Sequence, residues 1–339
     1  MIRVFLLFAL LLAPLFAQPA MASAEADCKH MTRILAVPDP VSGRRYVILV
    51  SLPDNFTTTP QVKRPVLVLA DGTRAFPSLA CKVRTLARRN AIGIDPVIVG
   101  LSYALGEDLQ DSRRRDYTPV PRADSDLVYG GAEPYKKYLD EVVLRRVEKA
   151  FNTDPAQRIF WGHSYGALLG AYILLTQPSM FQTWLLGSPS FWYEEGAIYD
   201  FERTYALNNR RLDARVLMYV GGKEVARYDR ARRGYTRDMV GGVRRFKNRL
   251  RARRYGGLTL KSYVLRGLDH RTAAIPGFEW AMQTAFPPGA KPAAVEKPTT
   301  ENKSATGGIP VTDEKPTPGR FAPAEDTAPV GVNFPTGEK

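Results

Sequence analysis

Apolar residues fall in short runs along most of the chain, and each run has about the length of one strand. The runs are rich in β-branched and other apolar residues, which is typical of buried strands. They predict strands at 46–53, 65–70, 96–101, 158–161, 183–186, 216–220 and 258–265. Between them, apolar positions at helical spacing predict helices at 135–147, 165–175, 235–254 and 275–286. This alternation predicts an α/β fold, with a mostly parallel sheet covered by helices on both faces.

The first 24 residues have the layout of a cleaved secretory signal. Arg3 precedes an apolar run over 4–17, and two small-x-small triplets follow at 20–22 and 22–24. The run is short and badly flanked for a stable membrane anchor, although an uncleaved anchor stays open as the alternative. We therefore expect a signal peptide at 1–24 and an exported protein, either periplasmic or secreted.

The last 53 residues, 287–339, differ in composition from the rest of the chain. They contain ten of the 26 prolines, among Lys, Glu, Thr and Ala, and show no apolar periodicity. Such a segment buries too little apolar surface to offset its ordering entropy, so we predict a disordered tail. Residues 25–286 are left as one α/β domain.

The net charge of +14 belongs to this domain, because the signal and the tail are nearly neutral. Twelve Lys and Arg lie between residues 227 and 254, against only Asp229 and Asp238. No nucleic-acid recognition motif accompanies them, and export argues against such a partner. We interpret the run as a solvated basic helix face, with contact to an anionic substrate or a membrane surface as the alternatives. The pattern gives no oligomeric state.

Cysteines and histidines are scarce, with two and three in the whole chain. They are scattered and form no ligand set for a metal, so we expect neither a metal nor another cofactor. Because an exported chain meets oxidising chemistry, Cys28 and Cys81 are candidates for a disulfide. The alternative is two unpaired thiols, one of them buried.

The segment GHSYG at 162–166 lies between a predicted strand and a predicted helix. Strand, G-x-S-x-G and helix together are typical of a turn that lifts a serine hydroxyl above a sheet, where it can act as a nucleophile. We therefore predict Ser164 as a nucleophile. A tight turn without chemistry is the alternative.

A serine nucleophile needs a base, and only three histidines exist. His163 adjoins the serine inside the turn and is expected to point away from the hydroxyl. His30 precedes the first predicted strand. His270 follows the last one, where this chain order of serine, acid and histidine places the base. Elimination selects His270.

The acid of such a triad is expected after the strand at 216–220. Glu224 follows that strand directly and is our candidate, with Asp229 as the alternative. Asp213 lies at the wrong end of the strand, and Asp269 adjoins the base and is typical of a turn residue.

Two backbone N–H groups are candidates for binding an oxyanion. The N–H of Tyr165 lies at a predicted helix N-terminus, and that of Thr73 lies in the loop after the strand at 65–70. For Thr73, an ordinary strand-to-helix turn is the alternative.

Residues for substrate contact are suggested by position. Arg115 ends a run of three arginines in a predicted loop, and Trp192 follows another strand. Both would suit an anionic aromatic acyl group, whereas core packing and simple solvation are the alternatives.

Several of these segments match a known family. The chain resembles the putative esterase family of α/β-hydrolases, which includes S-formylglutathione hydrolases (the esterase D group), feruloyl esterases, mycolyltransferases and trilactone siderophore esterases. The matching segments span 44–286 and are YVILVSLP, LVLADGTRAF, RRRDYTP, RIFWGHSYGALLGAYILLTQPSMF, GSPSFWY, VGGKE and GLDH. The pairing of GHSYGA with GSPSFWY looks most like the siderophore esterases, which hydrolyse catecholate trilactones. The resemblance implies an α/β-hydrolase fold, Ser164 as nucleophile, His270 as base, and donors at Thr73 and Tyr165.

Together these features predict an exported serine ester hydrolase that works through an acyl-enzyme, with a catecholate siderophore lactone as the candidate substrate. Acyl transfer, feruloyl ester or thioester hydrolysis on the same fold, and a non-catalytic binding module remain as alternatives.

Overall fold

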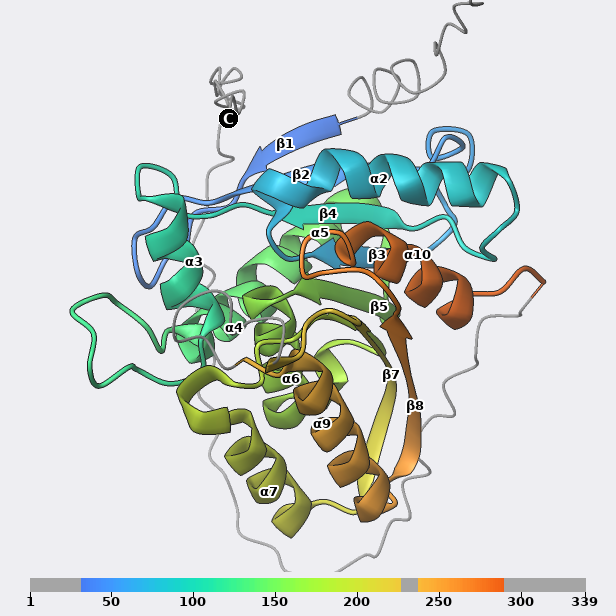
Figure 1. Cartoon of the computed structure of the whole chain (residues 1–339). Helices are drawn as coiled ribbons and strands as arrows, with labels where there is room; N and C mark the ends of the chain where they lie inside the picture. The colour runs from blue at the N-terminus through green and yellow to red at the C-terminus, as the bar shows by residue number, and fades with distance from the viewer. Residues whose placement is uncertain (1–31, 227–236, 290–339) are drawn as a thin grey trace, which may run out of the picture. The chain divides into compact units, whose positions relative to one another are not determined.

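An eight-stranded sheet runs through the described part of the chain, residues 32–226 and 237–289 of a computed structural model (Figure 1). Its spatial order is β1-β2-β4-β3-β5-β6-β7-β8. β2 pairs antiparallel with β1 and β4, and all other pairs are parallel. The strands are β1 (Thr32–Ala36), β2 (Val47–Ser51), β3 (Arg64–Leu69), β4 (Val97–Leu101), β5 (Thr153–His163), β6 (Thr183–Gly187), β7 (Arg211–Gly221) and β8 (Gly256–Leu265). The predicted mostly parallel sheet is confirmed.

The seven predicted strands correspond to β2 through β8, with shifted ends. β1 has no counterpart among the predicted strands. Its residues, TRILA, are exposed or only half-buried at the edge of the sheet, so their apolar pattern is weak. Antiparallel pairing with β2, as in Ile34 opposite Leu49, makes this segment a strand.

Helices cover both faces of the sheet (Figure 1). They are α2 (Gly72–Arg88), α3 (Leu109–Tyr117), α4 (Ala132–Tyr138), α5 (Arg145–Phe151), α6 (Tyr165–Thr176), α7 (Ile198–Asn208), α9 (Met239–Arg253) and α10 (Ala274–Ala285). A π-helical segment (Leu139–Leu144) joins α4 to α5, so the helix predicted at 135–147 forms as a composite. Alternate residues of a strand point to opposite faces of the sheet, so the sheet has an apolar core on each face. Leu67 belongs to the core that includes residues of α2 and α10, and Val68 to the core that includes residues of α6 and α9.

Helix α6 starts beside the G-x-S-x-G turn and anchors it. All residues from Gly166 to Leu175 are buried, which explains why this segment is apolar all round rather than on one face. A turn that leads from β5 into such a helix is held from both sides by the protein core.

The three consecutive arginines lie on α3, not in the loop that the sequence predicted. Asp108 caps this helix, because its side chain accepts hydrogen bonds from the backbone N–H groups of Gln110 (2.8 Å) and Asp111 (3.1 Å). The helix is polar over most of its length, so the periodicity of apolar residues gave no sign of it.

Several predictions concern residues outside the described ranges. They include the signal segment 1–24, Cys28 and nearly all of the tail 287–339, so the disulfide to Cys81 of α2 stays a prediction. The described residues belong to one compact unit. Within them, no helix has both the length and the apolar character that a membrane span requires.

Candidate active site

Ser164 lies in a strained turn between the end of β5 and the start of α6. Its backbone has φ 59° and ψ −118°, a conformation that an L-residue rarely adopts. A Cβ on Gly162 would overlap the backbone of Gly166, so glycine lets the strand and the helix meet here. The N–H of Ser164 donates to the carbonyl of Gly187 in the neighbouring strand (2.9 Å). These constraints fix the hydroxyl at the carboxyl end of the parallel strands.

His270 and Glu224 form a short hydrogen bond, with 2.6 Å between His270 Nδ1 and Glu224 Oε2. The carboxylate side chain is 5% exposed and the imidazole 40% exposed, so one partner is buried and the other faces outward. Glu224 follows β7, and His270 lies in the turn after β8, as the order of the strands predicts. Asp229, the alternative acid, lies outside the described residues.

The Glu224 carboxylate has three donors. Besides His270, the hydroxyl of Ser188 (2.6 Å) and the N–H of Gly221 (2.7 Å) donate to its Oε1. Burial alone would raise the pKa of Glu224, but these hydrogen bonds and the His270 charge outweigh it and lower the pKa below its ordinary value. An ionised carboxylate only accepts hydrogen bonds, so His270 Nδ1 carries its proton and Nε2 is left as the basic nitrogen.

Ser164 and His270 lie on the same side of the molecule without a direct hydrogen bond among the described contacts. The ring of His163, the residue before Ser164, lies 4.7 Å from the His270 ring between centroids. Ser164 Oγ instead lies 3.3 Å from the hydroxyl oxygen of Ser190. Long or absent nucleophile–base contacts are common in substrate-free sites and tighten when substrate binds.

The segment GSPSFWY supplies two contacts that the sequence analysis missed. The hydroxyl of Ser188 donates to Glu224 and that of Ser190 lies 3.3 Å from Ser164 Oγ, and both serines are buried. The sequence signals were that this segment matches the family and that it follows β6, whose carboxyl end adjoins the Ser164 turn.

The side chain of His163 contacts the backbone of His270. Its Nε2–H donates to the backbone carbonyl of His270 (2.9 Å), and its buried Nδ1 has no partner among the described residues. Burial and the nearby positive charge of His270 lower the pKa of His163 to about 4. His163 therefore stays neutral at neutral pH.

Replacing His163 by glutamine should remove one component of acid sensitivity. Because the folded chain resists protonating His163 while the unfolded chain protonates it at pH about 6.5, this group costs stability as the pH falls from about 6.5 to 4, by up to about 3 kcal/mol. Urea unfolding at pH 7, 5.5 and 4 should show that the wild type loses more stability than His163→Gln. Parallel curves for the two proteins would contradict this assignment.

Both predicted oxyanion donors lie in the first turn of a helix, Thr73 in α2 and Tyr165 in α6. Neither N–H has a backbone acceptor among the described contacts. First-turn N–H groups point along the helix axis with no partner inside the helix, and the helix dipole favours an anion there. Asp71, which precedes α2, adopts a left-handed conformation (φ 57°) that turns the chain from β3 into the helix.

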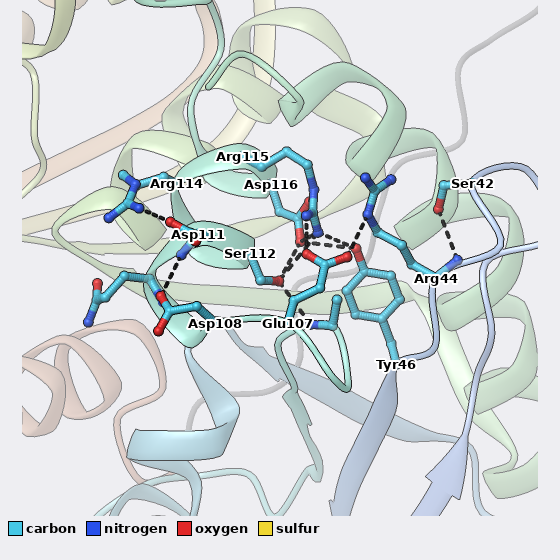
Figure 2. A network of polar contacts seen from close by, with 12 residues as sticks. Ser42, Arg44, Tyr46, Glu107, Asp108, Asp111, Ser112, Arg114, Arg115 and Asp116 are labelled. Atoms are coloured by element: carbon cyan, nitrogen blue, oxygen red, sulfur yellow. Dashed lines mark hydrogen bonds and ion pairs between the residues drawn. The ribbon is translucent and has the colours of Figure 1, made fainter. Parts of the chain in front are cut away.

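Arg115, predicted to contact substrate, is used inside the protein (Figure 2). Its guanidinium donates to Asp116 (2.8 and 3.1 Å), to the hydroxyl of Tyr46 (3.2 Å) and to Glu107, and its side chain is 12% exposed. Because the charge of Arg115 is already paired with two carboxylates, it is not available to bind an anionic ligand. The structure does not bring Arg115 to the Ser164 turn and brings Arg113 there instead.

Trp192 lies beside Tyr165, with 6.1 Å between the two rings. The guanidinium of Arg237 lies 3.8 Å above the Trp192 ring, and that of Arg113 lies 5.4 Å from the Tyr165 ring. Tyr165, the residue that follows Ser164, and its neighbour Trp192 therefore each have an arginine guanidinium near the ring. Trp192 is the residue that the sequence analysis suggested for contact with an aromatic acyl group.

No three His, Cys, Asp or Glu side chains gather as a metal site would require within 32–226 and 237–289.

The sheet order, the strained serine turn and the histidine–carboxylate pair define a protein of the α/β-hydrolase fold. A family model described as "Putative esterase" matches residues 40–273, well over half of the chain. The chain therefore belongs to this esterase family.

Relatives of the chain include named siderophore esterases. It is 34% identical over 160 residues to the ferri-bacillibactin esterase BesA of Bacillus subtilis, and this match covers 44% of this chain and 54% of that protein. It is 31% identical over 156 residues to the siderophore triacetylfusarinine C esterase of Aspergillus fumigatus, with 44% and 53% covered. The chain thus spans about half the length of these curated relatives.

A solved structure, the siderophore hydrolase EstB from Aspergillus nidulans, shares the fold with a TM-score of 0.64 at 23% identity. That match covers 76% of this chain and 95% of the other.

Proposed function

We propose that the protein is a serine carboxylic-ester hydrolase with Ser164, His270 and Glu224 as its triad. The observation that carries the proposal is the 2.6 Å bond between buried Glu224 and His270, next to the strained Ser164 turn. Family membership and the named esterase relatives support the same reaction class.

In the first half-reaction, His270 Nε2 takes the proton of the Ser164 hydroxyl as the oxygen attacks the ester carbonyl. The N–H groups of Thr73 and Tyr165 bind the oxyanion of the tetrahedral intermediate. His270 then gives its proton to the leaving alkoxide, which departs as the alcohol and leaves an acyl-enzyme on Ser164. Water repeats these steps and releases the acid. Glu224 keeps Nδ1 protonated and stabilises the imidazolium in both halves.

We propose a siderophore lactone with anionic aromatic acyl groups as the substrate. The relatives act on siderophores according to their names, and the arginine-stacked rings of Trp192 and Tyr165 adjoin the nucleophile. Aromatic rings can stack on a catechol, and the positive net charge of the chain favours an anionic substrate.

A hydrolysis panel tests this proposal. It contains iron-free and ferric catecholate trilactones, feruloyl esters, short p-nitrophenyl esters and acyl thioesters, each with and without an added alcohol acceptor. We expect kcat/KM for a trilactone to exceed that for the p-nitrophenyl esters by about tenfold or more, because binding energy from the remote aromatic groups contributes. Cleavage of thioesters alone would contradict the substrate proposal but not the mechanism. Transfer of the acyl group to the added alcohol would indicate an acyltransferase.

We also propose that the protein is exported, because Arg3 and the apolar run over 4–17 have the form of a secretory signal. N-terminal sequencing of the protein from its native host tests this. Recovery from the cytoplasm with residues 1–24 still attached would contradict it.

A further inference from the structure

Arg113 of α3 joins the two backbone segments that carry the proposed oxyanion donors. Its Nε and Nη2 donate to the two carboxylate oxygens of Asp71 (2.6 and 2.8 Å), and Nη2 also donates to the carbonyl of His163 (3.2 Å). Asp71 directly precedes α2, which carries the Thr73 N–H. His163 directly precedes Ser164. One guanidinium therefore spans the loop after β3 and the turn after β5.

The contact to His163 bears on the nucleophile itself. The peptide group between His163 and Ser164 is held at both ends, by Arg113 at its carbonyl and by the carbonyl of Gly187 at its N–H (2.9 Å). Because Ser164 has a positive φ, the orientation of this peptide plane determines where its side chain and the following Tyr165 N–H point.

The contact to Asp71 has the same effect on the other segment. Asp71 holds a left-handed conformation with little solvent access, and its carboxylate also accepts from the hydroxyl of Tyr103 (2.6 Å). Its N–H donates to the hydroxyl oxygen of Tyr117 (3.0 Å). A Cβ on Gly72 would overlap the backbone of Gly100, so α2 starts in close contact with β4. The start of α2 is thus fixed by contacts to the carboxylate and the backbone N–H of Asp71 and by the close packing of Gly72 on β4.

The ion pair between Arg113 and Asp71 is sheltered, with side chains 14% and 10% exposed. A bidentate pair of this kind is stronger and more directional than a surface ion pair. The ring of Tyr165 also stacks near the guanidinium (5.4 Å). The arginine thus contacts the residues before and after Ser164.

We propose that Arg113 is a positioning residue that holds the Thr73 and Tyr165 N–H groups at the separation needed to bind the oxyanion. The inference rests on the proposed function. A group with this role stabilises the transition state more than the bound ester, so its loss should appear in kcat and leave KM nearly unchanged.

The test compares Arg113→Gln and Arg113→Lys with the matched variant Arg158→Gln, using a p-nitrophenyl ester and a boronic acid as an analogue of the tetrahedral intermediate. Arg158 is also an arginine with little exposure (12%) that pairs with carboxylates, Glu148 and Asp140, but it lies in the middle of β5 and its described contacts do not include the Ser164 turn. It reports what a lost buried ion pair does to stability alone.

We expect Arg113→Gln to lower kcat by about 10- to 100-fold and to weaken boronic acid binding by a similar factor, with KM within about threefold of wild type. Arg113→Lys keeps the charge but not the bidentate geometry, so it should recover only part of kcat even if the glutamine variant folds poorly. Arg158→Gln should lower the melting temperature comparably while kcat stays within about threefold.

Three results would overturn the inference: kcat of either Arg113 variant equal to wild type, loss confined to KM, or an equal loss of kcat in Arg158→Gln. Ser164→Ala, measured alongside, separates this from the proposed function. If Ser164→Ala retains full turnover, the triad itself is wrong. If it is inactive while Arg113→Gln is fully active, only the positioning role is wrong.

Discussion

Alanine in place of Ser164 is expected to lower kcat/KM for the best ester of the panel by about 10⁴- to 10⁶-fold, the loss seen when a triad nucleophile is removed. In the proposed mechanism the hydroxyl oxygen forms the acyl-enzyme, and no other serine lies in the strained turn between β5 and α6. The residual rate would come from the backbone donors and from substrate binding.

The alanine variant should remain folded, because the backbone contacts of position 164 to Gly187 and within α6 do not involve the side chain. Thermal unfolding and steady-state kinetics on the same preparation measure both effects. An unfolded variant would leave Ser164→Cys, which retains a nucleophile, as the informative substitution. Undiminished turnover in a folded Ser164→Ala would exclude this residue as the nucleophile.

Glu224→Gln is expected to lower kcat/KM by about 10³- to 10⁴-fold, through the tautomer of His270. Oε1 of Glu224 accepts from Ser188 and Gly221, so the amide oxygen of a glutamine would face these donors and its NH₂ group would face His270 Nδ1. His270 would then keep its proton on Nε2 and could not accept one from Ser164. The variant also lacks the negative charge that stabilises the imidazolium.

Two acidic residues serve as controls for Glu224. Asp269 adjoins His270 in sequence, but its carboxylate is exposed, and among the described residues it accepts only from its own turn, from Arg271 and Thr272. Asp269→Asn should therefore leave kcat/KM within about threefold of wild type. Asp229→Asn tests the alternative acid. A large loss in Asp229→Asn together with an active Glu224→Gln would reverse the assignment.

The sequence was sufficient for the elements whose burial dictates their composition. Strands β2 to β7 were predicted because their central residues are buried and therefore apolar, and α6 was predicted because the core surrounds it. The edge strand β8 is largely exposed and was predicted from its apolar and β-branched residues. In contrast, β1 lies at the sheet edge and α3 is polar and capped by Asp108, so neither carries a clear apolar pattern.

The same division applies to the site. The candidates Ser164 and His270 followed from a local motif and from the scarcity of histidine, and the order of the strands predicted that Glu224 would lie near His270, where the structure places it. The roles of neighbouring arginines could not be predicted. Successive residues on a helix point about 100° apart, so only the placement of α3 separates Arg113, at the Ser164 turn, from Arg115, in the network around Asp116.

Contacts between residues far apart in the sequence could not be predicted from the pattern of apolar and polar residues. The bond from His163 to the carbonyl of His270 joins residues 107 positions apart, and Ser188 meets Glu224 across 36. They depend on the parallel register of β5 through β8, which places the carboxyl ends of these strands at one edge of the sheet.

The most direct measurement is the site at which a fluorophosphonate probe attaches, found by mass spectrometry of the digested protein. The probe reacts with a serine only where a base activates it and oxyanion donors stabilise the adduct. A single adduct on the peptide that contains position 164, abolished in Ser164→Ala and strongly slowed in His270→Ala, is the predicted result. An adduct on another residue, or a folded wild-type protein that remains unlabelled, would contradict the account.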